Sequence, residues 1–420
     1  MRDWRLRGIN HEGVQNVKMA ERLGLLIREV QAFLFLREEK MIKQYLLAPG
    51  PTPIPDEVVR AMAQTMIHHR TPQFSKIFAE AREGLQALFG TKNDVLTLAS
   101  SGTGAMEAAV SNLFSPGEKV LVVNGGKFGE RWQQICQAFG LEVIQLKVEW
   151  GKAVKVDVVE KHLKVYPDIQ GVLIQASETS TTTLHPVREI AQLTRNGPLL
   201  IVDGVTAVGV LPVPMDDWGI DVLVTGSQKA LMLPPGLGFV ALSDRAWART
   251  EKAKLPRFYL DLKLERKNQQ KKTTAFTPAV SLIFGLHASL KMMQEEGLER
   301  VYARHERLAR ATRAAAKALG LDLLAPENPS PATTGVMLPE GMDGEKLLEY
   351  LRDRMGITFA EGQDQLKGKI IRIAHVGYIG AFDVLVAIGA LEMALKKFGH
   401  PVKFGQGVAA AQEILMESLD

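Results

Sequence analysis

The sequence has one cysteine, Cys136, among its 420 residues. A single thiol excludes an internal disulfide framework, and it excludes any zinc or iron–sulfur site that is built from several cysteines. The adjacent pair His68 and His69 has no third histidine or carboxylate at ligand spacing, so we expect no metal. A chain so poor in cysteine fits a reducing compartment, and we expect a cytoplasmic protein.

The sequence also lacks an excess of charge of either sign. Its 51 Lys and Arg residues nearly balance its 47 Asp and Glu residues, and both signs are scattered along the chain. Such a balance gives no footprint for nucleic acid or for acidic lipid. Long apolar runs are absent too, because charged residues such as Arg28 and Arg37 interrupt the early ones well short of a membrane span. We therefore expect neither a nucleic-acid partner nor a membrane partner.

Residues 1–40 differ in pattern from everything that follows them. Their apolar residues fall at helical spacing, which favours an amphipathic helix, and the mixed acidic residues argue against a transit peptide. Met41 then opens a strongly patterned region. We predict that residues 1–40 are an extension outside the physiological chain, and that a chain starting at Met41 keeps its activity and stability.

From Asp94 onward, short apolar strands alternate with helices. The strands are expected at residues 95–98, 120–123, 143–146, 172–175 and 199–202. This alternation predicts an α/β fold with a mainly parallel sheet sandwiched by helices on both faces. The turn between Lys229 and residues 237–242 is too short for a parallel crossover, so that last strand should run antiparallel. Functional groups should gather at the carboxyl ends of the parallel strands.

Those strand ends carry polar residues of three kinds. Lys229 follows an apolar strand and a Gly-Ser turn, Asp203 follows four apolar residues, and Thr179 lies in a Ser-Glu-Thr-Ser run. A buried lysine has a lowered pKa, and its neutral amine attacks carbonyl groups. The alternative for Lys229 is a side chain that extends to water, and for Asp203 it is a turn-forming role.

Two further segments have shapes that suit a ligand. Residues 100–105 form a small-residue turn between a strand and a helix, which directs backbone N–H groups at an anion, and Thr103 adds a hydroxyl. Taken alone, an ordinary helix cap is the simpler interpretation. Phe128 follows two glycines, where its ring could project over a ligand or could pack against its own helix.

Together these features describe a cradle for pyridoxal phosphate. The aldehyde of this cofactor combines with a lysine, its phosphate suits a helix N-terminus, and an aspartate keeps its pyridine nitrogen protonated. A nicotinamide-binding domain fits less well, because residues 101–104 lack the later glycine of the dinucleotide fingerprint.

From Met41 to about Gly399, the chain resembles class V of the fold-type I pyridoxal-phosphate enzymes, and within it the alanine/serine-glyoxylate (serine-pyruvate) aminotransferases. The matching motifs stand in one order along the chain, at residues 47–52, 101–107, 177–180, 202–203, 226–230, 276–278 and 372–375. The resemblance implies a Schiff base on Lys229 and contact between Asp203 and the pyridine nitrogen. It also implies a homodimer.

The resemblance assigns further binding residues. The phosphate is expected to bind near Thr103, Gly104, Ala105 and Gln228, the ring hydroxyl near Thr179, and the ring face at Phe128, where many relatives have tryptophan. Arg372 matches the arginine that binds the substrate carboxylate, and Gly50 matches a substrate-binding position. Thr277 matches a residue that reaches the phosphate of the neighbouring subunit's cofactor, although Thr274 competes for that match. For Arg372, the alternative is an ion pair with a surface acid.

The implied reaction is an aminotransfer with ping-pong kinetics. No second arginine is marked by a motif for a side-chain carboxylate, which favours alanine or serine as the donor and glyoxylate or pyruvate as the acceptor. Other class V enzymes stay open, including phosphonate and kynurenine-type aminotransferases, lyases and epimerases. A cysteine desulfurase fits poorly because Cys136 precedes the lysine. A non-catalytic subunit would predict a lost lysine or aspartate.

The same resemblance divides the chain into parts. Residues 41–59 should form an N-terminal arm that packs on the small domain, residues 60–300 the large cofactor-binding domain, and residues 301–399 a smaller C-terminal α+β domain. Residues 400–420 form a tail beyond the resemblance, for which a terminal helix is the expectation.

Overall fold

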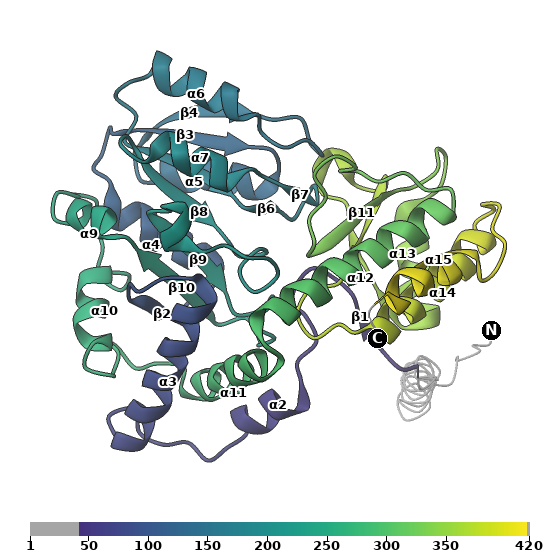
Figure 1. Ribbon diagram of the computed structural model, residues 1–420, viewed down its shortest axis with the longest axis horizontal. Coiled ribbons are helices and arrows are strands. Elements are labelled where there is room, and N and C mark those ends of the chain that lie inside the picture. The colour runs from purple at the N-terminus through teal and green to yellow at the C-terminus, as the bar shows by residue number, and fades with distance from the viewer. Residues whose placement is uncertain (1–41, 418–420) are drawn as a thin grey trace, which may run out of the picture. The chain divides into compact units, whose positions relative to one another are not determined.

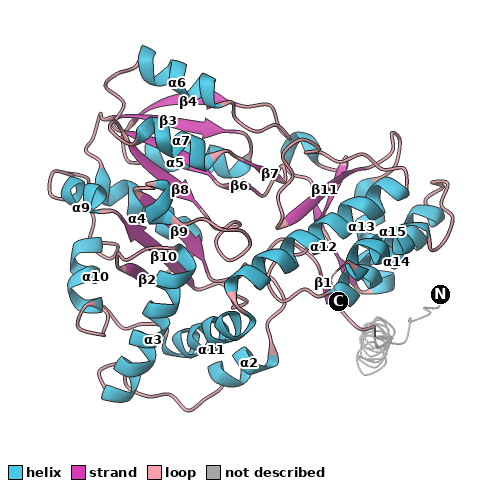
Figure 2. Ribbon diagram, in the orientation of Figure 1, coloured by secondary structure: helices cyan, strands magenta, loops and turns pink. Residues whose placement is uncertain are grey.

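The computed structural model describes residues 42–417, and the predicted extension at residues 1–40 lies outside the described residues. From Tyr45 onward the described chain forms one compact unit. Figure 2 shows its strands in two main groups, a large sheet and a smaller one. Its chain path is coloured by residue number in Figure 1.

The large sheet has seven strands in the order β2-β10-β9-β8-β5-β3-β4. Strands β9, β8, β5, β3 and β4 pair in parallel, whereas β10 pairs antiparallel with both β2 and β9. The predicted antiparallel strand after Lys229 is therefore confirmed. The strands are β2 (Val95–Ala99), β3 (Lys119–Asn124), β4 (Glu142–Lys147), β5 (Gly171–Gln175), β8 (Leu199–Asp203), β9 (Val222–Gly226) and β10 (Leu237–Leu242).

Both faces of this sheet are buried, as the nearly continuous apolar strands predict. Along β8, Leu200 and Val202 belong to one hydrophobic core, whereas Ile201 belongs to the core on the opposite face. Helices cover each core. The helices beside this sheet are α2 (Asp56–Met62), α3 (Pro72–Phe89), α4 (Gly102–Leu113), α5 (Lys127–Ala138), α6 (Val156–Val165), α7 (Val187–Thr194), α8 (Met215–Trp218), α9 (Asp244–Thr250), α10 (Leu262–Gln269) and α11 (Val280–Glu296).

A second core lies beyond α11. The long helix α12 (Leu298–Ala318) runs from the large sheet toward this core in Figure 1 and packs against α14 and α15. The antiparallel sheet β11-β14-β13 lies beside these helices. The elements are β11 (Thr333–Met337), α13 (Gly344–Met355), β12 (Ile357–Thr358), β13 (Ala360–Glu361), a 3₁₀ turn η1 (Asp364–Leu366), β14 (Ile370–Ala374), α14 (Ala381–Lys397) and α15 (Gln406–Met416).

The N-terminal arm joins this second core. Strand β1 (Tyr45–Leu46) pairs in parallel with β12, and the carbonyl of Leu47 accepts a 2.8 Å hydrogen bond from the backbone N–H of Ala374. Leu47 itself is buried among the residues of the second core. The domain limits expected from the resemblance stay predictions.

Helices α2 and α15 lie near the two ends of the described chain. The N-cap of α2 is Pro55, Asp56 is its first helical residue, and the helix ends at Met62. Proline fits that boundary because it has no backbone N–H and its fixed φ is compatible with the start of a helix. In the predicted tail, α15 forms and packs against α12.

The register of the parallel strands decides where the functional residues meet. Gln175 on β5 pairs with Asp203 on β8, and Asp203 pairs with Val224 on β9. The three strands therefore end at nearly the same level, so the segments that follow them leave the sheet at one edge.

Candidate active site

Lys229 is buried, with 8% of its surface exposed, just beyond the end of β9. Its Nζ donates a hydrogen bond to the carbonyl of Pro49, and the Thr52 hydroxyl donates to the carbonyl of Lys229 at 3.0 Å. Burial is the main cause that lowers the pKa of Lys229 to about 8, and the nearby charge of Arg372 adds to it, while Asp203 opposes both. The amine therefore has a large neutral fraction near pH 8, as a nucleophile or a base needs.

Gly50 is in close contact with this lysine. Its φ of +138° lies in a region that favours glycine, and a Cβ built there would stand 2.5 Å from Lys229 Nζ. The space beside the amine thus depends on the missing side chain. This contact explains why a glycine is needed between two prolines, whereas the substrate-binding role expected for Gly50 stays a prediction.

Asp203 ends β8 with 4% of its surface exposed. Its Oδ1 accepts a 2.8 Å hydrogen bond from the backbone N–H of Val205. Burial raises the pKa of Asp203 to about 6, and the charge of Glu178 raises it further, whereas Arg131 and Lys229 lower it. A buried carboxylate of this kind is stabilised by a cation, and a protonated pyridine nitrogen would supply one.

The N-terminus of α4 borders the end of β9. A Cβ on Gly226 would lie 3.2 Å from the backbone nitrogen of Gly102, so the two backbones approach closely only because position 226 is glycine. The first N–H groups of a helix have no intrahelical partner and attract anions. Ser101 caps the helix by accepting from Gly104 N at 3.4 Å. Both expected roles of this turn, the cap and the anion site, are therefore compatible.

The side chain of Gln228 provides an independent observation at this helix end. Its Oε1 atom is buried without a hydrogen-bond partner, although burying such a group unpaired is costly. A water molecule that bridges to a phosphate at the free N–H groups of α4 would donate a hydrogen bond to this oxygen. These residues fit pyridoxal phosphate: the start of α4 would hold its phosphate, and Asp203 would face its pyridine nitrogen.

Phe128 is half-buried at the start of α5, next to the same strand edge. The guanidinium of Arg131 lies over its ring, 4.8 Å from the ring centre, and Arg131 Nη1 donates to the Thr103 hydroxyl at 3.2 Å. Phe128 and Thr103, which were predicted separately, are thus linked through one arginine. The ring is absent from the main apolar cores, which argues against a purely structural packing role.

Arg372 reaches the site from β14. Its Nε and Nη2 donate to the carbonyl of Glu361 at 3.0 and 2.8 Å, and its Nη1 donates to the carbonyl of Thr179 at 3.0 Å. These partners are backbone carbonyls, so the alternative of an ion pair with a surface acid is wrong. Burial lowers the pKa of Arg372 to about 10, which leaves it charged at neutral pH. One N–H on each of Nη1 and Nη2 stays available for a carboxylate.

Thr179 joins two strand ends. Its hydroxyl lies 2.6 Å from the hydroxyl of Thr206, three residues after Asp203. The described structure therefore brings together Lys229, Asp203 and Arg372 through their electrostatic interactions. Gly50 contacts Lys229 and Thr179 contacts Arg372, whereas Thr103 and Phe128 are joined to each other through Arg131. Gly104 and Ala105 lie in the first turn of α4, and Gln228 directly precedes Lys229.

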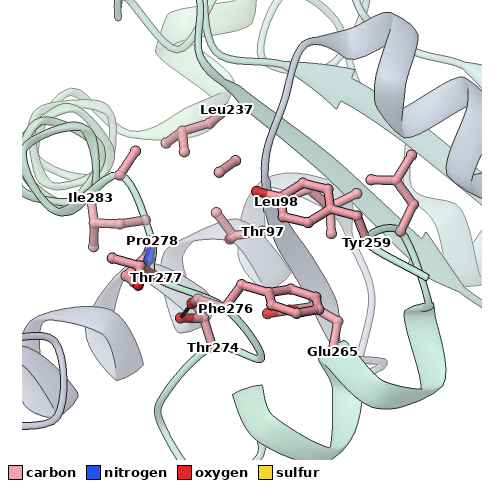
Figure 3. Close-up of a pocket in the computed structure, with 13 residues that line it drawn as sticks. Thr97, Leu98, Leu237, Tyr259, Glu265, Thr274, Phe276, Thr277, Pro278 and Ile283 are labelled. Carbon is pink, nitrogen blue, oxygen red and sulfur yellow. Dashed lines mark hydrogen bonds between the residues drawn. The ribbon is translucent and has the colours of Figure 1, made fainter.

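Thr277 belongs to a different place. It lines a small cavity of about 20 Å³ between β2, the start of β10 and the segment before α11, and Figure 3 shows it beside Thr274, Phe276 and Pro278. Thr277 is exposed, whereas Thr274 is buried and donates its hydroxyl to the carbonyl of Phe276 at 2.5 Å. Thr277 is therefore the freer of the two to contact another chain.

Several residues of the site could not be found from sequence patterns. The carbonyl of Pro49 carries no side-chain signal, and Gly377 lies in a loop whose backbone approaches the carbonyl of Lys229. Arg131 was missed although it stands three residues after Phe128, a spacing that places both on one helix face. Glu178 lies within the matched motif at residues 177–180, but the resemblance implies no role for it.

Other kinds of site find little support in residues 42–417. No group of three or more His, Cys, Asp or Glu residues there is arranged to hold a metal ion. Within the same range, none of the helices combines the length and apolar character that crossing a bilayer requires. Cys136 is buried in α5, and burial raises the pKa of its thiol to about 12.

Comparison with known proteins identifies relatives over most of the chain. Residues 44–374 match the family model of class-V aminotransferases. A protein named soluble hydrogenase, small subunit, from Synechococcus is 44% identical over 89% of this chain and 98% of its own. The L-aspartate–glyoxylate aminotransferase of Paracoccus denitrificans is 39% identical over 88% of this chain and 95% of its own. The serine–glyoxylate aminotransferase of Methylorubrum extorquens is 36% identical, with coverages of 90% and 97%.

The fold has solved relatives. The pyridoxamine-pyruvate aminotransferase of Mesorhizobium loti matches with a TM-score of 0.86 at 30% identity, covering 90% of this chain and 98% of that one. Its architecture is that of the fold-type I pyridoxal-phosphate enzymes, as the α/β sheet predicts. The chain is therefore a class-V aminotransferase that depends on pyridoxal phosphate.

Proposed function

We propose that this enzyme moves the amino group of alanine or serine to glyoxylate or pyruvate. The observation that carries the proposal is the buried amine of Lys229, whose pKa is lowered to about 8 and which interacts electrostatically with Asp203 and Arg372. Relatives named for glyoxylate support the choice of acceptor. One of them is named for aspartate as donor, so aspartate belongs in any test of the donor.

Bound pyridoxal phosphate supplies an aldehyde that combines with primary amines and a ring that accepts electrons. Lys229 supplies the amine that holds the aldehyde between turnovers. When substrate takes its place, the neutral Nζ accepts the proton from the substrate α-carbon, which a general base with a pKa near ambient pH does efficiently. Burial by Pro49 and Gly50 keeps water away from that amine.

Asp203 and Arg372 act on opposite charges. Asp203 balances a positive charge on the pyridine nitrogen, and Arg372 binds the substrate α-carboxylate through its two remaining N–H groups. Lysine could not replace Arg372, because a point charge lacks the planar pair of donors. One amino-binding site then serves donor and acceptor in turn, so ping-pong kinetics are expected.

The proposal includes a homodimer. Phe258 and Tyr259 are exposed and pack around Phe276, close to the cavity that Thr277 lines. A second copy on this aromatic surface would bring its own site near the exposed Thr277, in agreement with the role expected from the family resemblance. A cytoplasmic location is also part of the proposal, and the single buried cysteine supports it.

The test is a spectroscopic titration of the purified holoenzyme with alanine, serine, aspartate and glycine, followed by glyoxylate or pyruvate. We expect one donor to bleach the cofactor absorbance and one acceptor to restore it, with the matching keto acid and amino acid released. The control is Lys229→Ala, which should lose the lysine-linked absorbance and nearly all turnover. Undiminished turnover in that variant would overturn the proposal.

The same titration separates the alternative functions. A lyase or epimerase of this class would release product or racemise the donor without needing a second keto acid. A non-catalytic subunit would show no donor-dependent change at all. A donor that bleaches the absorbance but is not followed by recovery with any 2-oxo acid would count against aminotransfer.

A further inference from the structure

Glu178 is fully buried at the end of β6 (Ser177–Glu178), and its carboxylate is surrounded by hydrogen-bond donors. Oε2 accepts from the backbone N–H groups of Phe128 at 3.1 Å and Gly129 at 3.0 Å. Oε1 accepts from the backbone N–H of Ser180 at 3.1 Å and from its hydroxyl at 2.5 Å. The Ser180 hydroxyl in turn accepts from the N–H of Lys127 at 2.9 Å.

These contacts cap α5 from a distant part of the chain. The local N-cap, Gly126, offers no side-chain hydrogen bond, so Glu178 and Ser180 satisfy the first N–H groups of the helix instead. A Cβ on Gly126 would lie 2.6 Å from Cδ of Glu178, which shows how closely the two segments meet. A negative charge at a helix N-terminus is favourable, and it offsets part of the cost of burying the carboxylate.

The residues beside Glu178 contact the rest of the site. The carbonyl of Thr179 accepts from Arg372, and the Thr179 hydroxyl meets that of Thr206 beyond Asp203. Three consecutive residues, 178–180, therefore contact the helix start that bears Phe128, the arginine assigned to the substrate carboxylate, and the strand end that bears Asp203. Burial raises the pKa of Glu178, yet its carboxylate accepts hydrogen bonds from four donors, which favour the charged form.

We propose that Glu178 is a positioning residue of the aminotransfer reaction, because its carboxylate fixes the ring of Phe128 relative to Arg372. The cofactor ring would lie against Phe128 while the substrate carboxylate lies on Arg372, so their relative placement sets the geometry at the substrate α-carbon. This inference rests on the roles proposed above for Phe128 and Arg372. It goes further by assigning a function to a carboxylate that need not touch either ligand.

The test compares Glu178→Gln with the wild-type holoenzyme. Glutamine keeps the volume, but its amide nitrogen is a donor. Either the N–H groups of Phe128 and Gly129 or the two donors of Ser180 therefore lose their acceptor. We expect the visible circular dichroism of the bound cofactor to fall about twofold. The dissociation constant of the cofactor should rise about tenfold, as expected for the loss of a hydrogen bond to a charged group. The KM for the amino donor should also rise.

Glu392→Gln is the matched control. Glu392 is also buried and accepts from the backbone N–H groups of Gly405 at 2.8 Å, Gly407 at 2.7 Å and Val408 at 3.1 Å, where α15 begins. The control should lose a similar amount of thermal stability. Its cofactor dichroism, its cofactor dissociation constant and its KM should stay at wild-type values.

Ser180→Ala is a second variant that keeps the charge of Glu178 and removes the hydroxyl bridge to Lys127. It should change the dichroism and the dissociation constant in the same direction by a smaller factor, about threefold for the constant. Should Glu178→Gln fail to fold, Ser180→Ala decides alone. If either folded variant loses stability as the control does but keeps wild-type dichroism and cofactor affinity, the inference is overturned. A wild-type protein without any cofactor band would instead overturn the proposed function.

Discussion

At Gly50, a single missing side chain leaves room for the reactive amine. The Cβ of Gly50→Ala would lie 2.5 Å from Lys229 Nζ, on a backbone with φ +138°. We expect this variant to fold but to lose the cofactor band and at least about a hundredfold in kcat/KM, because displacement of a catalytic group by about 1 Å has that effect. Absorbance of the purified protein and steady-state kinetics measure both.

The control for Gly50→Ala is Gly117→Ala. Gly117 has a φ of +78° and nothing within 4 Å of a built Cβ. It should cost about 1–2 kcal/mol of stability from backbone strain and leave the cofactor band intact. Equal loss of the band in both variants would show that strain, and not the clash with Lys229, is responsible.

The buried carboxylate of Asp203 is expected to lower the stability of the apoprotein, although the reaction needs it. Burial raises its pKa from 3.8 to about 6, so the folded apoprotein binds this proton more tightly than the unfolded chain does. Its ionisation therefore lowers the free energy of unfolding as pH rises from about 4 to about 6. Asp203→Asn should remove this decrease and stabilise the apoprotein at pH 7 by about 1–3 kcal/mol. Urea unfolding of apoprotein at pH 4.5 and 7 measures the difference.

The same variant should lose at least about a hundredfold in kcat, because the neutral amide cannot balance the pyridine charge. A fully active Asp203→Asn enzyme would contradict the assignment of Asp203. Lower apoprotein stability at pH 7 would contradict the view that its carboxylate is costly to bury.

Among the elements, α12 holds a loop of the second core against the lysine. His305 on α12 donates through Nδ1 to the carbonyl of Val301, and its Nε2 accepts from the N–H of Gly377 at 3.0 Å, so the ring must be neutral. A Cβ on Gly377 would lie 3.0 Å from the carbonyl of Lys229. Helix α12 thus supports the backbone beside the reactive amine.

Burial lowers the pKa of His305 to about 3, so the unfolded chain binds this proton first as pH falls. The histidine's contribution to stability is complete above pH 6.5 and is lost progressively on acidification. Between pH 7 and pH 5, the free energy of unfolding of the wild type should decrease by about 2 kcal/mol more than that of His305→Gln. Denaturant titrations at the two pH values test this, and equal decreases in both proteins would refute it.

At the scale of the whole molecule, the homodimer determines whether Thr277 has a role. Phe258 is 78% exposed beside Tyr259 and Phe276. Changing Phe258 and Tyr259 to serine should raise the dimer dissociation constant at least about tenfold, because aromatic residues supply much of the energy of such interfaces. Light scattering after gel filtration measures the mass, and activity should fall on dilution.

Phe382→Ser is the control for that experiment, since Phe382 is 82% exposed on α14. It should leave the mass unchanged. A wild-type protein that is monomeric at micromolar concentration would contradict the dimer, and dissociation by Phe382→Ser instead would place the interface elsewhere.

The sequence by itself determined the order of strands and helices, the antiparallel β10 and the residues at the strand ends. These follow from local patterns, because apolar runs, glycine turns and chain length constrain the connections between neighbouring strands. Lys229 and Asp203 were singled out in this way, whereas Arg372 was assigned from the family resemblance.

The tertiary structure decided which distant groups meet. Three contacts of the site join segments that are far apart in the chain. The carbonyl of Pro49 faces Lys229, Glu178 caps α5, and Arg372 binds the carbonyls of Glu361 and Thr179. Backbone carbonyls and helix caps supplied by distant segments leave no periodic trace in a sequence. The lowered pKa of Lys229 likewise arises from burial, which the fold creates and no local motif encodes.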